Sequence, residues 1–331
     1  IMKYTPSLLN EGDDRKVNID HSDQLKFILH SHGKQWGAWA LLNALPSHPV
    51  ASLKNITQVR NWKNNKNQPI PQVEIEQGTC KDTVSVVLPT LDRYDYLPGC
   101  LQSLREQIYQ PVEIICVDQN SNEDRRPDIY ESFDDLPLMV IWQDERGQST
   151  ARNRALKEVT GDWIFFVDDD STYPDHAIQS HMAVVEHYSA DASTGLSVPP
   201  REYKVPEGYN YYRLAHNLDT GNCLIKRSMV LEVGGFDRQY DFGKGADRDL
   251  GMRLYKHGGV IIHNPDVKRI HYKAEGGLRQ FGVLWDNESL GKSSPMPPVT
   301  ITYYYFHYFS RAMSRNAILL SLLFSKLPSS Q

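Results

Sequence analysis

The sequence contains little cysteine, and the cysteines do not follow a pattern that would cross-link a small fold. Its four cysteines (Cys80, Cys100, Cys116 and Cys223) lie far apart in the 331 residues, without the spacing of a zinc site or a disulfide framework. Cys100 and Cys116 fall inside apolar segments, so we expect them to be small buried side chains in a reducing compartment. No signal peptide is apparent, and we predict a cytoplasmic protein.

An excess of positive charge is also missing. Lys and Arg total 36 against 41 Asp and Glu, which gives a net charge of −5. Since a basic patch or stripe is the usual footprint of nucleic-acid binding, we expect no nucleic-acid partner.

A long apolar run is missing as well. The aromatic-rich stretch from Thr302 to Leu327 is interrupted by Arg311 and Arg315, so no segment of about 20 apolar residues is available to cross a bilayer. A packed helix is one interpretation of this stretch. The alternative is an interfacial helix that makes a peripheral contact with the inner face of the cell membrane.

The composition changes along the chain and suggests three parts. Residues 61–72 are polar and contain two prolines, which indicates a linker. Before it, the pattern suggests a strand at 24–30 and a short helix at 36–45. We predict an N-terminal module of unknown role over residues 1–82, a central domain over 83–277, and a helical, aromatic-rich segment over 278–331.

Strands alternate with helices in the central domain. Apolar strands are expected at 84–88 (stopped by Pro89), 112–117, 138–142 and 163–167, with helices at 95–107 and 149–159. Short strands at 223–225 and 260–262 and a helix at 246–256 should follow. This alternation predicts an α/β fold with a mostly parallel central sheet covered by helices on both faces.

Three consecutive aspartates, Asp168, Asp169 and Asp170, follow the apolar strand at 163–167. Adjacent carboxylates at the end of a buried strand repel each other, and a bound divalent cation is the usual compensation. Ligands of open α/β sheets also sit at the carboxyl ends of strands. An acidic turn that caps the next helix is the simpler alternative.

Several short motifs occur in a fixed order and together resemble the family-two, GT-A-type inverting glycosyltransferases. They are Pro89-Thr90-Leu91-Asp92-Arg93, Asp118-Gln119-Asn120-Ser121, Ala151-Arg152-Asn153, Asp168-Asp169-Asp170, Thr220-Gly221-Asn222, Gly234-Gly235-Phe236-Asp237 and Asp247-Arg248-Asp249-Leu250. The resemblance extends from Thr83 to Gly277. It implies a GT-A fold, in which a nucleotide-binding half is fused to an acceptor-binding half.

The resemblance also implies roles for the donor-side residues. Thr90, Arg93 and Arg152 would border the nucleotide, and the Asp118 carboxylate would accept a hydrogen bond from the imide N–H of uracil. Asp168 would face the ribose and the donor sugar. Asp169 stands where the family commonly has a small residue, and either metal ligation or solvent exposure would suit it.

The remaining roles concern the metal and the acceptor. Asp170 would bind Mn²⁺ or Mg²⁺ that bridges the two phosphates of the donor. His271 would contact the metal or the diphosphate. Asp247 would be the general base for the acceptor hydroxyl, although Ala246 replaces the Glu that often precedes it, and Asp249 is its nearest competitor.

The expected function is therefore metal-dependent, inverting transfer of a sugar from a nucleotide-diphosphate donor, probably a UDP-sugar, to a hydroxyl of a glycan or lipid-linked acceptor. A sugar-nucleotide pyrophosphorylase or other nucleotidyltransferase is one alternative, but the loop after the first strand lacks the glycine-rich, basic character typical of such enzymes. A non-catalytic nucleotide- or glycan-binding relative is the other. No feature of the sequence fixes an oligomeric state.

Overall fold

The computed structural model describes residues 81–206, 209–274, 277 and 299–324, and isolated earlier positions (38, 40–42, 49, 55–57, 60 and 75). The chain divides into two compact units, Ile1–Pro71 and Gln72–Gln331. The strand expected at 24–30 and the linker at 61–72 lie outside the described residues. Of the helix expected at 36–45, positions 38 and 40–42 are described, and they are helical.

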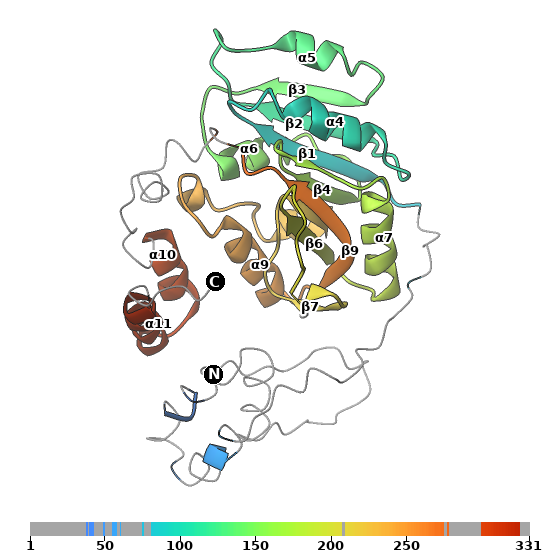
Figure 1. Ribbon diagram of the computed structural model, residues 1–331. Coiled ribbons are helices and arrows are strands. Elements are labelled where there is room, and N and C mark those ends of the chain that lie inside the picture. Colours follow the sequence, from blue (N-terminus) through green and yellow to red (C-terminus); the bar gives the residue numbers. More distant parts are fainter. Residues whose placement is uncertain are drawn as a thin grey trace. The chain divides into compact units, whose positions relative to one another are not determined.

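The second unit is built around one sheet, with the strand order β3-β2-β1-β4-β8-β6-β9-β5 and with β7 paired to β9 (Figure 1). Its strands are β1 (Val84–Thr90), β2 (Glu113–Asp118), β3 (Leu138–Trp142), β4 (Trp163–Val167), β5 (Ser171–Thr172), β6 (Ala192–Val198), β7 (Arg213–Ala215), β8 (Asn222–Lys226) and β9 (Ile261–His271). Strands β1 to β4 are parallel neighbours, whereas β8 is antiparallel to both β4 and β6. The predicted α/β class is confirmed.

Helices cover both faces of this sheet. They are α4 (Leu97–Arg105), α5 (Pro127–Glu131), α6 (Gln148–Ala155), α7 (Ala177–His187), α8 (Arg227–Glu232), α9 (Ala246–Lys256), α10 (Val299–Tyr308) and α11 (Arg311–Phe324), with a 3-10 turn η2 (Arg238–Tyr240). Val86 and Leu88 of β1 belong to the core that includes α4 and α7, and Val87 belongs to the core that includes α6 and α9. Successive side chains of a strand point to opposite faces, so an uninterrupted apolar strand such as β1 is buried on both.

Pro89 does not stop the first strand, contrary to the prediction. β1 continues to Thr90, and Pro89 lies opposite Val117 of β2. Proline lacks an N–H, but β4 pairs with β1 only from Val84 to Val87, so beyond that point β1 has a neighbour on one side only. The same divergence of β4 from β1 opens a crevice at the carboxyl ends of the two strands, where α/β proteins bind their ligands.

The last strand is longer than predicted. The expected strand at 260–262 is the first part of β9, which continues through Pro265 to His271. Asn264-Pro265-Asp266 has the composition of a turn, but here it is a bulge in the ladder with β6, whose register shifts between Thr194 and Leu196. β9 therefore carries its C-terminal residues to the carboxyl end of β4.

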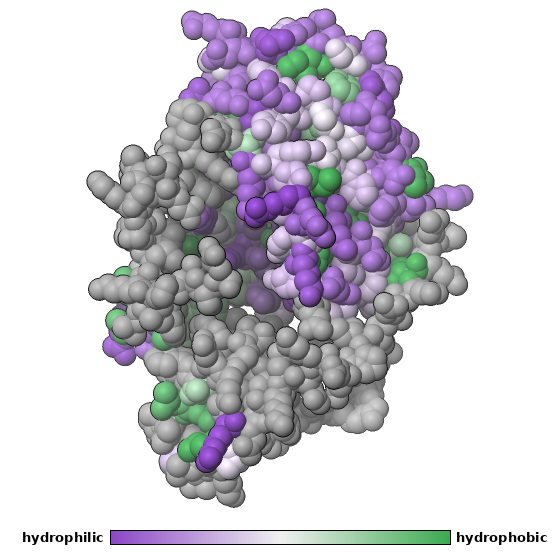
Figure 2. All heavy atoms as spheres, in the orientation of Figure 1, coloured by the Kyte–Doolittle hydropathy of each residue, from purple (hydrophilic) through white to green (hydrophobic). Residues whose placement is uncertain are grey.

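Among the coloured residues of the second unit, Figure 2 shows no broad apolar band on this face. Hydrophilic side chains predominate among the coloured residues, and hydrophobic ones form small separate spots. Among the residues that the structure describes, no helix combines the length and the apolar character needed to cross a membrane.

A buried histidine links α7 to the sheet and should make the stability of the fold depend on pH. Nδ1 of His181 lies 2.8 Å from Oγ of Ser193, and Nε2 lies 3.3 Å from Oδ1 of Asn222. Burial lowers the pKa of His181 from 6.5 to about 4. Since the folded pKa lies below the unfolded one, this histidine contributes stability above about pH 6.5 that is lost as the pH falls towards 4.

We expect the free energy of unfolding to decrease by roughly 3 kcal/mol over this interval because of His181 alone, given the difference between its folded and unfolded pKa values. His181→Gln should flatten the pH dependence between 6.5 and 4 in urea titrations. His187→Gln, an exposed position on the same helix, is the matched control and should leave the slope unchanged. An unaltered slope in His181→Gln would assign the acid sensitivity to other groups.

Candidate functional site

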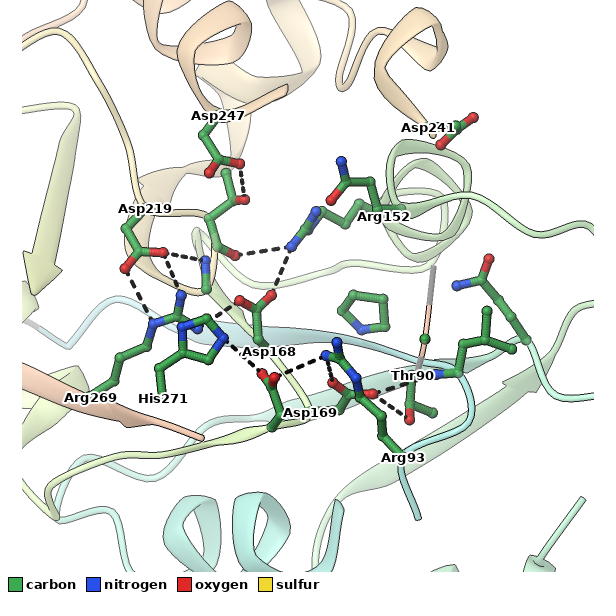
Figure 3. A pocket seen from close by; sticks show the side chains of 18 residues that line it. Thr90, Arg93, Arg152, Asp168, Asp169, Asp219, Asp241, Asp247, Arg269 and His271 are labelled. Carbon is green, nitrogen blue, oxygen red and sulfur yellow. Dashed lines mark hydrogen bonds and ion pairs between the residues drawn. The ribbon is translucent and has the colours of Figure 1, made fainter. Parts of the chain in front are cut away.

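A polar cavity of about 270 Å³ lies at the carboxyl ends of β1 and β4 and is closed by residues that precede β8, begin α9 and end β9 (Figure 3). Its lining residues are Pro89, Thr90, Leu91, Arg93, Gln119, Gln148, Arg152, Asp168, Asp169, Asp170, Asp219, Thr220, Gly221, Asp241, Asp247, Arg269, His271 and Gly277. With the exception of Asp118, all the predicted site residues are among them.

The first aspartate of the triplet is held by two buried arginines. Nη2 of Arg152 donates to Oδ1 of Asp168 at 3.0 Å, and Nη1 of Arg269 donates to Oδ2 at 2.6 Å. Burial alone would raise the pKa of Asp168, but Arg269 and Arg152 hold it well below its usual range. Its negative charge is thus already balanced by the protein.

The second aspartate faces the end of β1. Oγ1 of Thr90 donates to Oδ2 of Asp169 at 2.8 Å, and Nη1 of Arg93 donates to Oδ1 at 3.0 Å. Asp169 is buried, and this burial raises its pKa to about 6. Of the two environments considered for Asp169, solvent exposure is therefore excluded. Thr90 and Arg93, which were expected to border the nucleotide, also fix this carboxylate.

The third aspartate has an oxygen without a hydrogen bond. Oδ2 of Asp170 accepts from the backbone N–H of Ala274 at 3.0 Å, whereas Oδ1 is buried without a hydrogen-bond partner and lies 3.3 Å from Nε2 of His271. One ligand atom each from Asp168, Asp170 and His271 lie within 4.8 Å of one another. Carboxylate oxygens suit Mn²⁺ or Mg²⁺, and the imidazole offers a nitrogen ligand beside them, so these residues fit a divalent cation.

Asp118 does not reach the cavity. Its carboxylate is fully buried: Oδ2 accepts from the hydroxyls of Tyr94 and Tyr130, both at 2.6 Å, and Oδ1 accepts two N–H groups of Asn120. A carboxylate has about four lone-pair sites, so all are used. The next residue, Gln119, lines the cavity instead.

The orientation of the Gln119 side chain follows from a hydrogen bond that its amide accepts. Its Oε1 accepts from the backbone N–H of Gly147 at 2.7 Å. A backbone N–H requires an acceptor, so the amide NH₂ of Gln119 must be the group left for a ligand. No described residue accepts a hydrogen bond from it.

Asp247 lies in the first turn of α9 and lines the cavity. Its Oδ1 accepts from the hydroxyl of Thr220 at 2.5 Å. Burial raises the pKa of Asp247, although Arg152 and Thr220 act in the opposite direction. Asp249 does not line the cavity, because its carboxylate is buried against Arg253 and Tyr308.

Arg269 and Asp219 line the cavity, but the sequence analysis missed them. Nη2 of Arg269 donates to Oδ1 of Asp219 at 2.8 Å, so Arg269 links Asp219 to Asp168. A Cβ at Gly221 would lie 2.0 Å from Nη1 of Arg269, so only glycine fits there. Residues two apart on a strand share a face, and the spacing of Arg269 from His271 was the available signal.

The chain is similar in sequence to known glycosyltransferases. Residues 85–235 match the model of glycosyl transferase family 2. The chain is 28% identical over 239 residues to a glucosyl-dolichyl phosphate glucuronosyltransferase of Haloferax volcanii. The aligned region covers 62% of this chain and 75% of that protein. It is also 25% identical over 169 residues to a GalNAc(5)-diNAcBac-PP-undecaprenol beta-1,3-glucosyltransferase of Campylobacter jejuni. Here the aligned region covers 50% of this chain and 44% of that protein.

Two solved structures share the fold at low sequence identity. S. aureus TarS 1-349, in complex with UDP-GlcNAc, has a TM-score of 0.55 at 19% identity, over 75% of this chain and 74% of that one. The mannosyltransferase PcManGT from Pyrobaculum calidifontis, in complex with GDP-Man and Mn²⁺, has a TM-score of 0.52 at 19% identity. The superposition covers 89% of this chain and 87% of that one. Residues 85–235 thus resemble glycosyl transferase family 2, and the domain around them has the GT-A fold.

Proposed function

We propose that the protein is a metal-dependent, inverting glycosyltransferase that moves a sugar from a nucleotide-diphosphate donor to an acceptor hydroxyl. The observation that carries this proposal is the placement of two different carboxylate sites in one cavity. Asp170 and His271 would form a cation site at the ends of β4 and β9, and Asp247 lies apart from them at the start of α9.

The donor side would position the diphosphate and its leaving charge. Asp170 and His271 would hold the cation, which neutralises the departing nucleoside diphosphate. Asp168 is kept ionised by Arg152 and Arg269, so it can accept hydrogen bonds from sugar or ribose hydroxyls without titrating. Thr90 and Arg93 would fix Asp169 beside the nucleotide.

The acceptor side would remove the proton from the attacking hydroxyl. A general base works best when its pKa is close to the operating pH, and burial moves the pKa of Asp247 upward in that direction. Single displacement requires this base on the face of the sugar opposite the leaving diphosphate, and the product would then have an inverted anomeric centre.

Contact with the base of the nucleotide is proposed for Gln119, with Asp118 acting through the loop it holds. The free amide NH₂ of Gln119 would donate to a carbonyl oxygen of the base, while Asp118 fixes Tyr94 and Asn120. TarS was solved with UDP-GlcNAc and PcManGT with GDP-Man, so both uracil and guanine are candidates, and we favour uracil.

A lipid-linked glycan is the proposed acceptor. The names of the H. volcanii and C. jejuni relatives both describe transfer to saccharides on polyprenyl carriers. Such acceptors lie at a membrane surface, and α10 and α11 expose Phe306, Met313 and Leu319 near Arg311 and Arg315. A peripheral contact at the inner face of the cell membrane would bring the cavity to its substrate.

The proposed function is tested by a screen of nucleotide binding, followed by a measurement of sugar transfer. With Mn²⁺ present, UDP or UDP-sugars should raise the melting temperature by mass action, and GDP and CDP should do so less. Gln119→Ala should weaken UDP binding by about tenfold, as expected for one lost hydrogen bond. Asp118→Ala should weaken it too, because the loop is released.

Product analysis then separates the alternatives. Release of UDP together with a glycosylated acceptor supports transfer. Formation of UTP from the UDP-sugar and pyrophosphate would instead identify a pyrophosphorylase. Tight donor binding without any turnover, including donor hydrolysis, would identify a binding protein.

A further inference from the structure

One face of α10 packs against the acceptor side of the domain. Thr300, Tyr304 and Tyr308 recur at intervals of four residues and so share a helix face. Tyr304 is buried in a cluster with Tyr240 and with Ala246, which precedes Asp247 in α9. The tyrosine-rich run is thus in part a packed surface rather than an exposed aromatic belt.

The N-terminal end of this face holds the loop before α9. Oγ1 of Thr300 accepts from the backbone N–H of Lys244 at 3.2 Å. The methyl group of Thr300 occupies the place of a side chain at position 243, where a Cβ would lie 2.3 Å away, so Gly243 is required. From the other side, Nε2 of Gln148 in α6 donates to the carbonyl of Gly243 at 3.3 Å.

The C-terminal end of the face holds α9 itself. The hydroxyl of Tyr308 donates to Oδ1 of Asp249 at 2.6 Å, and Arg253 donates to Oδ2 from Nε at 2.9 Å and from Nη2 at 2.6 Å. Arg253 also donates from Nη1 to the carbonyls of Val233 and Gly235. Asp249 is buried, so these partners fix its carboxylate, and the helix turn that carries it, in one position.

Asp247 belongs to the same first turn of α9 as Asp249. We propose that Tyr308 is a positioning residue for the reaction, and that α10 sets the place of Asp247 through the Tyr308–Asp249–Arg253 contacts. This inference rests on the proposed role of Asp247 as the general base. A small misplacement of a reacting group lowers turnover strongly. The residues proposed to bind the donor lie instead at or after the ends of β1, β2, β4 and β9 and in α6.

Tyr308→Phe removes the hydroxyl and keeps the ring. We expect the kcat of sugar transfer to fall about tenfold, since a hydrogen bond to a charged group is lost, while the Kd of UDP in Mn²⁺ stays unchanged. Tyr303→Phe is the matched control. It is the same change on the same helix, but its hydroxyl lies 3.2 Å from Asp237, outside α9, and kcat should not change.

A double-mutant cycle tests whether Tyr308 acts through Asp249. If Tyr308 acts through Asp249, the effects of Tyr308→Phe and Asp249→Asn on kcat should be less than additive. Equal kcat for Tyr308→Phe and the unmodified protein overturns the inference, as does a lower melting temperature with unchanged kcat, which indicates a structural role only. Absence of any transfer by the unmodified protein refutes the proposed function, and the inference with it.

Discussion

Asp247→Asn is expected to reduce sugar transfer by about 10²–10⁴-fold, the usual contribution of a positioned general base. The amide has the shape of the carboxylate and still accepts the hydrogen bond of Thr220, but it cannot take up a proton. The affinities for UDP and for Mn²⁺ should stay within a few fold of the unmodified protein. Single-turnover rates measure the loss of sugar transfer, and calorimetric titrations with UDP measure the affinity for the nucleotide.

The pH dependence provides a second readout of the same group. Burial raises the pKa of Asp247, so kcat should fall as the pH decreases through this raised value, because the base becomes protonated. The residual activity of Asp247→Asn should lack this acid limb.

Asp249→Asn is the control, and its effect should be smaller because Asp249 faces Arg253 and Tyr308 rather than the cavity. A greater loss in Asp249→Asn than in Asp247→Asn would show that the wrong carboxylate has been chosen. A product that keeps the anomeric configuration of the donor, detected by NMR, would refute single displacement altogether.

Asp170→Asn should abolish the metal dependence of donor binding without unfolding the protein. Loss of a residue that only orients a metal ligand costs about 10–100-fold in metal affinity, and loss of a ligand should cost at least as much. UDP affinity measured with Mn²⁺ and with an excess of chelator should differ for the unmodified protein and coincide for Asp170→Asn. Circular dichroism establishes that the fold is kept.

Asp169→Asn is the neighbouring control, since its carboxylate contacts Thr90 and Arg93. If Asp169→Asn loses the metal effect and Asp170→Asn keeps it, the middle aspartate is the ligand. Undiminished transfer in excess chelator would remove the metal from the proposal and leave the three aspartates as an ion-paired turn.

The sequence was most informative where strands are buried on both faces. Runs such as Val84–Leu88 and Trp163–Val167 have few alternatives to a central strand, so the position of Asp168 to Asp170 at the end of β4 could be predicted. Helix α9 was also predicted with its observed bounds, which placed Asp247 in a first turn.

Side-chain direction at the end of a strand was not predictable. Adjacent residues point to opposite sides, so the choice between Asp118 and Gln119 depends on whether Tyr94 and Tyr130 come close enough to use the carboxylate. Those contacts come from a loop and from a short helix whose packing no local pattern specifies. Arg269 was missed for a similar reason, since Asn264-Pro265-Asp266 has the local composition of a turn.

The ion pair between Asp168 and Arg269 joins residues 101 positions apart in the chain, and this separation has a consequence for folding. During synthesis the aspartates at the end of β4 emerge well before β9, so they lack the arginine that later balances Asp168. Contacts of such long range carry a high loop-closure cost and form late. We therefore expect the addition of β9 to the sheet and the completion of the ionic site to be one late folding event. A nucleotide or cation that binds there would stabilise only the chains in which β9 has joined the sheet.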